Sequence, residues 1–180
     1  MNYKRDSELM DKIKLNLGCG ERQFKDYINI DIRDIKGVDL IHNLIESLPY
    51  KNDTVDEIIA YDVLEHVSFR YTDKMFSDWV RVLKSGGKLE FSVPNLEAHI
   101  KLLQGGVTDP TTWRIKKNSF PAEWQFFIQN VFGMQDYKEN THYTTFIPEM
   151  VRNLMLRNNL KIKHIDASDT DRQITAFGEK

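Results

Sequence analysis

The sequence LNLGCGE, residues 15–21, decides the fold, because an apolar segment runs directly into a glycine-rich bend. Residues 13–17 are typical of a buried parallel strand. The glycines of the bend let the chain turn sharply and leave its backbone open to a ligand. A second apolar alternation, residues 27–32, carries Asp31 near its end, where open α/β sheets bind ribose hydroxyls. Together, the two segments predict a site for a nucleotide-like cofactor.

A Gly-x-Gly bend on its own would equally fit a tight turn from a strand into a loop. A Rossmann dehydrogenase would carry a third glycine where this chain has Gln23, and its acidic residue would lie further downstream than Asp31. Only residues 19–26 separate the two predicted strands, which is too short for a complete βαβ crossover. We therefore expect a loop or a stunted first helix between them.

Size and composition are those of one globular domain: 180 residues, of which 41% are hydrophobic and 29% charged. The formal net charge of −2 argues against nucleic acid and anionic membranes as partners. The sequence lacks a long apolar run and a signal-peptide pattern, so we expect a cytoplasmic protein without a membrane segment. Its single cysteine, Cys19, cannot form an internal disulfide. We interpret Cys19 as a small residue packed between glycines rather than as a nucleophile.

Further periodic segments predict the rest of a mostly parallel sheet. Strands are expected at residues 38–43, 56–61 and 88–93, with a closing hairpin at 160–167 and 172–178. Helices are expected at residues 3–12, from 62 onward, at 72–83 and at 147–155, with Thr72 as an N-cap and residues 84–87 ending that helix. The pattern is that of an α/β fold with a Rossmann-like, doubly wound, seven-stranded sheet and an antiparallel last strand.

Residues 95–146 interrupt this pattern. Helices are expected at 96–103 and 121–132, and aromatic residues are concentrated between Trp113 and Phe146. We interpret the segment as a substrate cap over the carboxyl ends of the strands, inserted into a single domain of residues 1–180, because ligands of such sheets bind there. A dimer contact or additional core would also account for the aromatic side chains.

Six short motifs follow one another along the chain. They are LNLGCG (15–20), YINID (27–31), SLPY (47–50), VDEI (55–58), VLEH (63–66) and RVLKSGGKL (81–89). Their order and spacing resemble those of class I S-adenosylmethionine-dependent methyltransferases, in particular a small bacterial branch. The resemblance covers most of residues 13–94 and, more loosely, the last helix and two strands. The short link before Asp31 is usual in this branch.

The resemblance implies that S-adenosylmethionine is the cofactor and that the two predicted segments hold it. The backbone of the bend would line its amino-acid part and sulfonium, through Leu17, Gly18, Cys19, Gly20 and Glu21. Asp31 would bind both ribose hydroxyls, with Ile32 against the adenine.

Two later positions would complete the cofactor site. The family often has aspartate where this chain has Asn43, whose carboxamide oxygen can still accept from the adenine amino group while the Leu44 N–H serves a ring nitrogen. A simple turn residue is the alternative for Asn43. A carbonyl of Tyr61 or Asp62 would accept from the cofactor's ammonium.

Transfer to a hydroxyl acceptor calls for a base. His142 is the first candidate, as base or substrate orienter, followed by His66, Glu65 and Asp62, although Glu65 and His66 also fit a structural helix-start pattern and a lone loop histidine is often solvated. The aromatic side chains that could enclose an acceptor, or belong to the core, are Trp124, Phe127 and Tyr143. We expect no metal site, because the aspartates show no ligand spacing.

The sequence therefore predicts a small cytoplasmic methyltransferase that uses S-adenosylmethionine to methylate a small molecule or a sugar, with O-methylation favoured over N-methylation. A homodimer is compatible with this reading. Two alternatives stay open: a non-catalytic module that binds the cofactor and a protein partner, and a nucleotide-sugar or nicotinamide enzyme, against which the missing third glycine argues.

Overall fold

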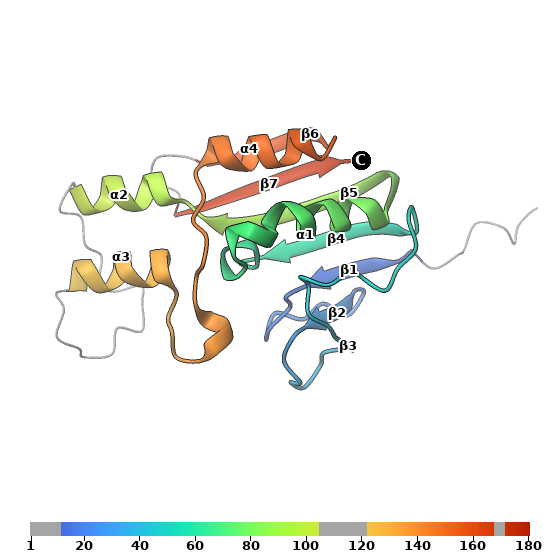
Figure 1. The fold of residues 1–180 in the computed structure, drawn as a ribbon, viewed down its shortest axis with the longest axis horizontal. Coiled ribbons are helices and arrows are strands. Elements are labelled where there is room, and N and C mark those ends of the chain that lie inside the picture. The colour runs from blue at the N-terminus through green and yellow to red at the C-terminus, as the bar shows by residue number, and fades with distance from the viewer. Residues whose placement is uncertain (1–11, 105–121, 168–171) are drawn as a thin grey trace, which may run out of the picture.

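The computed structural model describes residues 12–104, 122–167 and 172–180, so most of the helix expected at 3–12 lies outside the described residues. The strands are β1 (Lys14–Leu17), β2 (Ile28–Asp31), β3 (Leu40–Ile41), β4 (Val55–Tyr61), β5 (Leu83–Pro94), β6 (Lys161–Asp166) and β7 (Gln173–Glu179). They form one seven-stranded sheet in the order β3-β2-β1-β4-β5-β7-β6 (Figure 1). Within the described chain, β7 alone runs against the other strands. The predicted mostly parallel sheet with an antiparallel last strand is confirmed.

The strand order reverses beside β1, with β2 and β3 on one side and β4 and β5 on the other. Leu17 of β1 pairs with Ile30 of β2, and Asn16 of β1 pairs with Ile59 of β4. The carboxyl ends of these three parallel strands therefore meet at one edge of the sheet. Such a switch point is where open α/β sheets bind ligands. As expected, β1 and β2 are joined by a loop without a helix.

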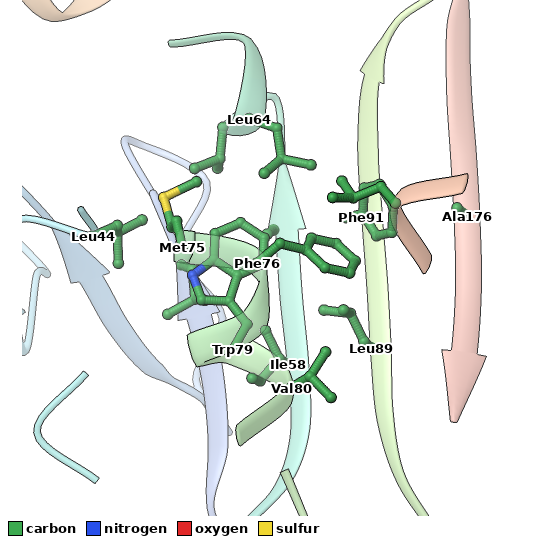
Figure 2. Close-up of a cluster of buried hydrophobic side chains, with 14 of the residues drawn as sticks. Leu44, Ile58, Leu64, Met75, Phe76, Trp79, Val80, Leu89, Phe91 and Ala176 are labelled. Carbon is green, nitrogen blue, oxygen red and sulfur yellow. The ribbon is translucent and has the colours of Figure 1, made fainter. Parts of the chain in front are cut away.

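Helix α1 (Phe69–Val82) buries an apolar stripe on one face of the sheet. Figure 2 shows Phe76 and Trp79 of this helix against Ile58 of β4 and Phe91 of β5. The rings of Phe76 and Phe91 meet edge to face with 5.3 Å between their centroids. Because Trp79 and Phe76 are both fully buried, either side chain contributes several kcal/mol to the stability of the fold.

The predicted start of α1 is wrong, and its end lies one residue before the predicted Leu83. The helix begins one turn before Thr72, with Ser68 as the N-cap, and the Thr72 hydroxyl donates to the Ser68 carbonyl at 3.3 Å. It ends at Val82, where the Arg81 and Val82 carbonyls accept from the N–H groups of residues 53 and 54 at 3.2 and 2.9 Å. The chain enters β5 directly, because the neighbouring loop satisfies these carbonyls. The left-handed Gly86 (φ 76°) lies within β5 instead.

Two other elements are shorter than predicted. The strand expected at 38–43 is reduced to the two residues of β3, and the helical segment expected from residue 62 is a single 3-10 turn, η1 (Leu64–His66). In both places the neighbouring backbone is hydrogen-bonded to another strand. The Asp39 N–H donates to the Asn29 carbonyl of β2, and the Asp62 N–H donates to the Ser92 carbonyl of β5.

Helix α4 (Pro148–Arg157) and the hairpin of β6 and β7 complete the sheet, as predicted. A Cβ on Gly178 of β7 would lie 2.8 Å from the Cε of Met155, a residue of α4. Gly178 pairs across the strands with Leu89 of β5, whose side chain packs beneath α1. Helices α1 and α4 therefore cover the same face (Figure 1). The opposite face carries polar contacts, including Tyr27 Oη to Glu57 at 2.5 Å. No helix in the described part of the chain is long and apolar enough to cross a membrane.

Residues 95–146 contain the two predicted helices, α2 (Leu96–Gln104) and α3 (Ala122–Phe132), followed by the short 3-10 turn η3 (Lys138–Asn140). The two ends of the segment meet: Asn95 and Phe146 form a parallel bridge, and the Leu96 N–H donates to the Phe146 carbonyl at 2.9 Å. Figure 1 shows α2 and α3 beyond the carboxyl ends of β4 and β5. Residues 105–121 lie outside the described chain.

Candidate functional site

A cleft of about 710 Å³ opens at the carboxyl ends of β1, β2 and β4. This volume lies within the range of about 300–1,000 Å³ that is usual for small-ligand sites. One wall follows the strand ends and the other comes from residues 136–143. The lining residues are Gly18, Gly20, Glu21, Asp31, Ile32, Arg33, Asn43, Leu44, Ile45, Asp62, Val63, His66, Val67, Asp136, Tyr137, Lys138, Glu139, Asn140 and Tyr143.

The glycine bend forms part of the first wall. Gly18 has φ of 61°, and a Cβ there would lie 2.5 Å from the Val63 Cγ2, so neither the backbone conformation nor the space admits a side chain. Beyond the bend, the Cys19 N–H donates to the Ile30 carbonyl at 3.0 Å and holds the loop against β2. The backbone of the bend is thereby fixed at the edge of the cleft.

Asp31 is held in a defined orientation although only 6% of its surface is exposed. Its Oδ2 accepts from the Gly20 N–H at 2.8 Å. Its Oδ1 accepts from the Arg33 N–H at 2.9 Å and from the Arg33 Nε at 3.2 Å. A carboxylate offers about four acceptor positions, so capacity remains for a ligand hydroxyl in the cleft.

Arg33 connects the two walls of the cleft. While its Nε bonds to Asp31, its guanidinium carbon lies 4.9 Å from the centre of the Tyr137 ring. The distance is that of a cation–π contact. Sequence reasoning missed Arg33 and the wall of residues 136–140. Arg33 follows Asp31 by two residues, so the alternation of an extended chain places both side chains on the same side. This spacing was the available signal.

The adenine side of the predicted site is apolar. Ile32 lines the cleft with 49% of its surface exposed, and Leu44 lies nearby in the lining. Asn43 also lines the cleft, but its Oδ1 accepts from the Ile45 N–H at 3.2 Å. The turn that was the alternative for Asn43 is therefore present, and the amide oxygen keeps one further lone pair for a ligand.

Three of the residues predicted to bind the cofactor do not line the cleft: Leu17 and Cys19 are buried next to it, and the Tyr61 hydroxyl donates to Glu90 at 2.7 Å on the far face of the sheet. Burial and then Asp31 raise the pKa of the Cys19 thiol to about 11, so the thiol stays protonated and packs as a small apolar group. Backbone roles for these three residues stay predictions. Asp62 lines the cleft with φ of 56°, an uncommon conformation for a residue other than glycine.

Backbone hydrogen bonds bring the distant segment 141–144 to the end of β4. The Glu65 carbonyl accepts from the Tyr143 N–H at 2.7 Å and the Thr144 N–H at 3.2 Å. The Thr144 hydroxyl donates to the Val67 carbonyl at 2.7 Å. As a result Tyr143, which is 55% exposed, lines the same cleft as the glycine bend.

The two candidate catalytic histidines lie together, but only one lines the cleft. The rings of His66 and His142 meet edge to face with 4.7 Å between centroids, and His66 is the one in the lining. Burial, and then the neighbouring His66, lower the pKa of His142 to about 4. His142 is therefore a weak base that contacts His66 and lies outside the cleft lining.

The remaining predicted substrate residues lie away from the cleft wall. Glu65 is fully buried, and burial followed by Asp62 raises the pKa of its carboxyl well above the ordinary value. Phe127 is half-buried on α3 and is not in the lining. Trp124 also belongs to α3, but its side chain is outside the described residues.

The lining is acidic overall. Its five carboxylates are those of Glu21, Asp31, Asp62, Asp136 and Glu139, against the two cations of Arg33 and Lys138. Such a surplus of negative charge favours a ligand that carries positive charge.

Comparisons with known proteins agree with this geometry. Residues 15–91 match the family model described as a methyltransferase domain. No curated protein matches the sequence at a significant level. A structure of an S-adenosylmethionine-dependent methyltransferase from Mesorhizobium loti is similar over 93% of this chain and 90% of its own, with 14% identity and a TM-score of 0.58.

Two further solved structures share the fold. A possible histamine N-methyltransferase from Thermotoga maritima is 13% identical over 93% of this chain and 82% of its own, with a TM-score of 0.59. The 1,6-didemethyltoxoflavin-N1-methyltransferase of Burkholderia thailandensis, with bound S-adenosylhomocysteine, is 11% identical over 93% and 70%, with a TM-score of 0.57. Residues 15–91, which include the glycine bend and Asp31, therefore match a methyltransferase domain, and the chain shares its fold with solved S-adenosylmethionine-dependent methyltransferases.

Proposed function

We propose that this enzyme methylates a hydroxyl group of a small molecule or a sugar bound between His66 and the wall of residues 136–143. The observation that carries the proposal is the single cleft in which the glycine bend and Asp31 share a lining with His66 and Tyr143. Cofactor and acceptor would thus lie in contact at the ends of β1 and β4.

The residues of the cleft fit S-adenosylmethionine. The fixed Asp31 carboxylate has an acceptor position for one ribose hydroxyl and gains a second when the Arg33 Nε contact is displaced. The exposed Ile32 suits the face of an adenine. The glycine bend would hold the amino-acid part, because Gly18 and Gly20 line the cleft without side chains that would block the backbone. The acidic lining of Glu21 and Asp62 suits the positive charges of the sulfonium and ammonium.

When bound, S-adenosylmethionine supplies an activated methyl group on a sulfonium, so the chain chiefly has to align the acceptor and exclude water. Tyr143 and Tyr137 offer exposed aromatic faces on the acceptor side of the cleft. His66 Nδ1 lies 3.2 Å from the Thr141 carbonyl and donates to it, which leaves the lone pair on Nε2 to take a proton. Burial lowers the pKa of His66 and keeps the ring neutral.

We assign the acceptor contacts to His66 and Tyr143 ahead of the other candidates. His142 would then orient His66 rather than act as the base itself, since it contacts that ring and lies outside the cleft lining. Contacts from Glu65 and Phe127 have no support from the cleft lining. A contact from Trp124 stays a prediction from the sequence.

Calorimetric titration tests the cofactor half of the proposal. S-adenosylhomocysteine should bind with one site per chain, and NAD should give no heat of binding. The acceptor half is tested by release of S-adenosylhomocysteine from S-adenosylmethionine in the presence of a panel of phenols, sugars and amines. Turnover with amines alone would refute O-methylation and leave the cofactor site intact.

We also propose a reducing cytoplasm as the compartment, because Cys19 is a buried free thiol. A homodimer remains a proposal, tested by light scattering across a range of protein concentrations.

A further inference from the structure

Three side chains beside the cleft form a cluster that the proposed reaction does not fully use. They are Glu65 and His66, in the turn after β4, and His142, in the loop after η3. One potential ligand atom from each side chain lies within 4.8 Å of the others. The Tyr143 and Thr144 hydrogen bonds to the Glu65 carbonyl hold this arrangement in place.

Both histidines of the cluster carry an unprotonated nitrogen. His66 Nδ1 lies 3.2 Å from the Thr141 carbonyl, and His142 Nδ1 lies 3.0 Å from the Asn130 carbonyl. A carbonyl oxygen only accepts, so each Nδ1 carries the proton and each Nε2 carries a lone pair. Histidines that bind metals are oriented in this way, with the second ring nitrogen donating to a backbone carbonyl.

The carboxyl group of Glu65 adds an oxygen donor without a partner. The residue is 1% exposed, and neither of its side-chain oxygens has a hydrogen-bond partner within the described part of the chain. Leaving a buried carboxyl unsatisfied is costly, and a bound cation would remove that cost. Two imidazole nitrogens and one carboxylate oxygen thus lie within 4.8 Å of one another.

We propose that Glu65, His66 and His142 bind a divalent transition-metal ion, with Zn²⁺ as the best match to two imidazoles and one carboxylate. Ligand atoms about 2.1 Å from a tetrahedral Zn²⁺ are separated by roughly 3.4 Å, so small side-chain rotations would close the cluster around the ion. Three protein ligands leave the fourth position open. Of the three ligands, His66 is the one that lines the cleft.

The site differs from the expectation drawn from the sequence, which considered only aspartate spacing. Metal binding itself does not depend on the proposed function. A role in catalysis does rest on it: an acceptor hydroxyl bound at the open position would release its proton to water more readily, and His66 would then serve as a ligand rather than as the base.

Titration of the untagged, metal-free chain with Zn²⁺, and with Co²⁺ as a spectroscopic probe, tests the proposal. One equivalent should bind. Glu65→Gln and His142→Ala should each weaken binding at least tenfold. His164→Ala is the matched control, because this histidine is 65% exposed on β6 and lies outside the cluster, and it should bind as the wild type does.

Nitrogen NMR on the wild type decides the question even if a variant fails to fold. Zn²⁺ should shift the Nε2 resonances of His66 and His142 and leave that of His164 in place. Any one of three results would overturn the proposal. They are the absence of stoichiometric Zn²⁺ binding, unchanged Zn²⁺ affinity in folded Glu65→Gln and His142→Ala, and Zn²⁺-induced shifts at other histidines only. S-adenosylhomocysteine binding by the metal-free chain is measured alongside, so failure of the cofactor site and failure of the metal site are told apart.

Discussion

Replacing Asp31 by alanine removes the side chain on which the cofactor assignment rests. Two ribose hydroxyls that donate to a carboxylate contribute about 1.5–3 kcal/mol each, or roughly 3–6 kcal/mol together. Binding of the ribose would displace the 3.2 Å contact from Arg33 Nε, a partly exposed ion pair whose loss costs at most about 1 kcal/mol. The affinity for S-adenosylhomocysteine should therefore fall by about 10²- to 10⁴-fold.

A graded series sharpens this prediction. Asp31→Asn keeps the shape and one acceptor oxygen but loses the charge, so its loss of affinity should be about 10- to 10²-fold, between those of wild type and alanine. Asp34→Ala removes a carboxylate from an exposed position three residues further along and should bind as wild type. Thermal unfolding is followed as well, because the Gly20 and Arg33 N–H groups lose their acceptor.

The assay is calorimetric titration at a temperature where every variant is folded. If Asp31→Ala binds S-adenosylhomocysteine within threefold of both wild type and Asp34→Ala, the assignment of Asp31 to the ribose is refuted. An equal loss in Asp31→Ala and Asp34→Ala would show a general effect of charge in this loop instead.

Three other substitutions test the fold around the site. Gly18→Ala should abolish cofactor binding and lower the thermal midpoint, because a Cβ would lie 2.5 Å from Val63 at a φ of 61°; an unchanged affinity in calorimetry would contradict this. Trp79→Ala should lower the free energy of unfolding in urea by about 3–5 kcal/mol, and a loss under 1 kcal/mol would show that the side chain is not a core residue. Burial opposes ionisation of Asp56, but the hydrogen bonds from Lys84 and a backbone N–H outweigh it and lower its pKa. The stability from Asp56 is therefore present above its unfolded pKa of about 3.9 and is lost as the pH falls through the lower folded value. Asp56→Asn should reduce the difference between urea midpoints at neutral pH and about pH 3, and an unchanged difference would refute this.

The wall of the cleft that contains the glycine bend and Asp31 was predictable from the local sequence. The glycine bend and Asp31 both follow apolar strands within a few residues, so strand periodicity alone brings them to one edge of the sheet. The start of α1 was not predictable in the same way. Its first turn is largely exposed, so the buried stripe that marks a helix begins only at Thr72, one turn late.

The other wall of the cleft depends on contacts between residues far apart in the chain. Tyr143 meets Glu65 through a backbone hydrogen bond, which leaves no pattern in either side chain. The aromatic residues of 113–146 indicated that the segment was functional, yet only Tyr137 and Tyr143 of them line the cleft among the described residues. For the same reason the sequence favoured His142 over His66 as base, although only His66 of this pair lines the cleft.

The Glu65 backbone oxygen is one of the groups that attach the wall of residues 136–143 to the end of β4, together with the Val67 carbonyl and Arg33. The Glu65 carbonyl has two lone pairs, and the N–H groups of Tyr143 and Thr144 occupy both. Because these bonds do not involve the side chain of Tyr143, substitutions at that position change the acceptor wall without loosening its attachment to the end of β4. The cofactor wall is fixed separately, through Gly18 and Asp31. If the proposed acceptor contacts are correct, we expect substitutions of the Tyr143 side chain to change acceptor preference while affinity for the cofactor is retained, because Tyr143 has no contact with Asp31 or Arg33 among those described above.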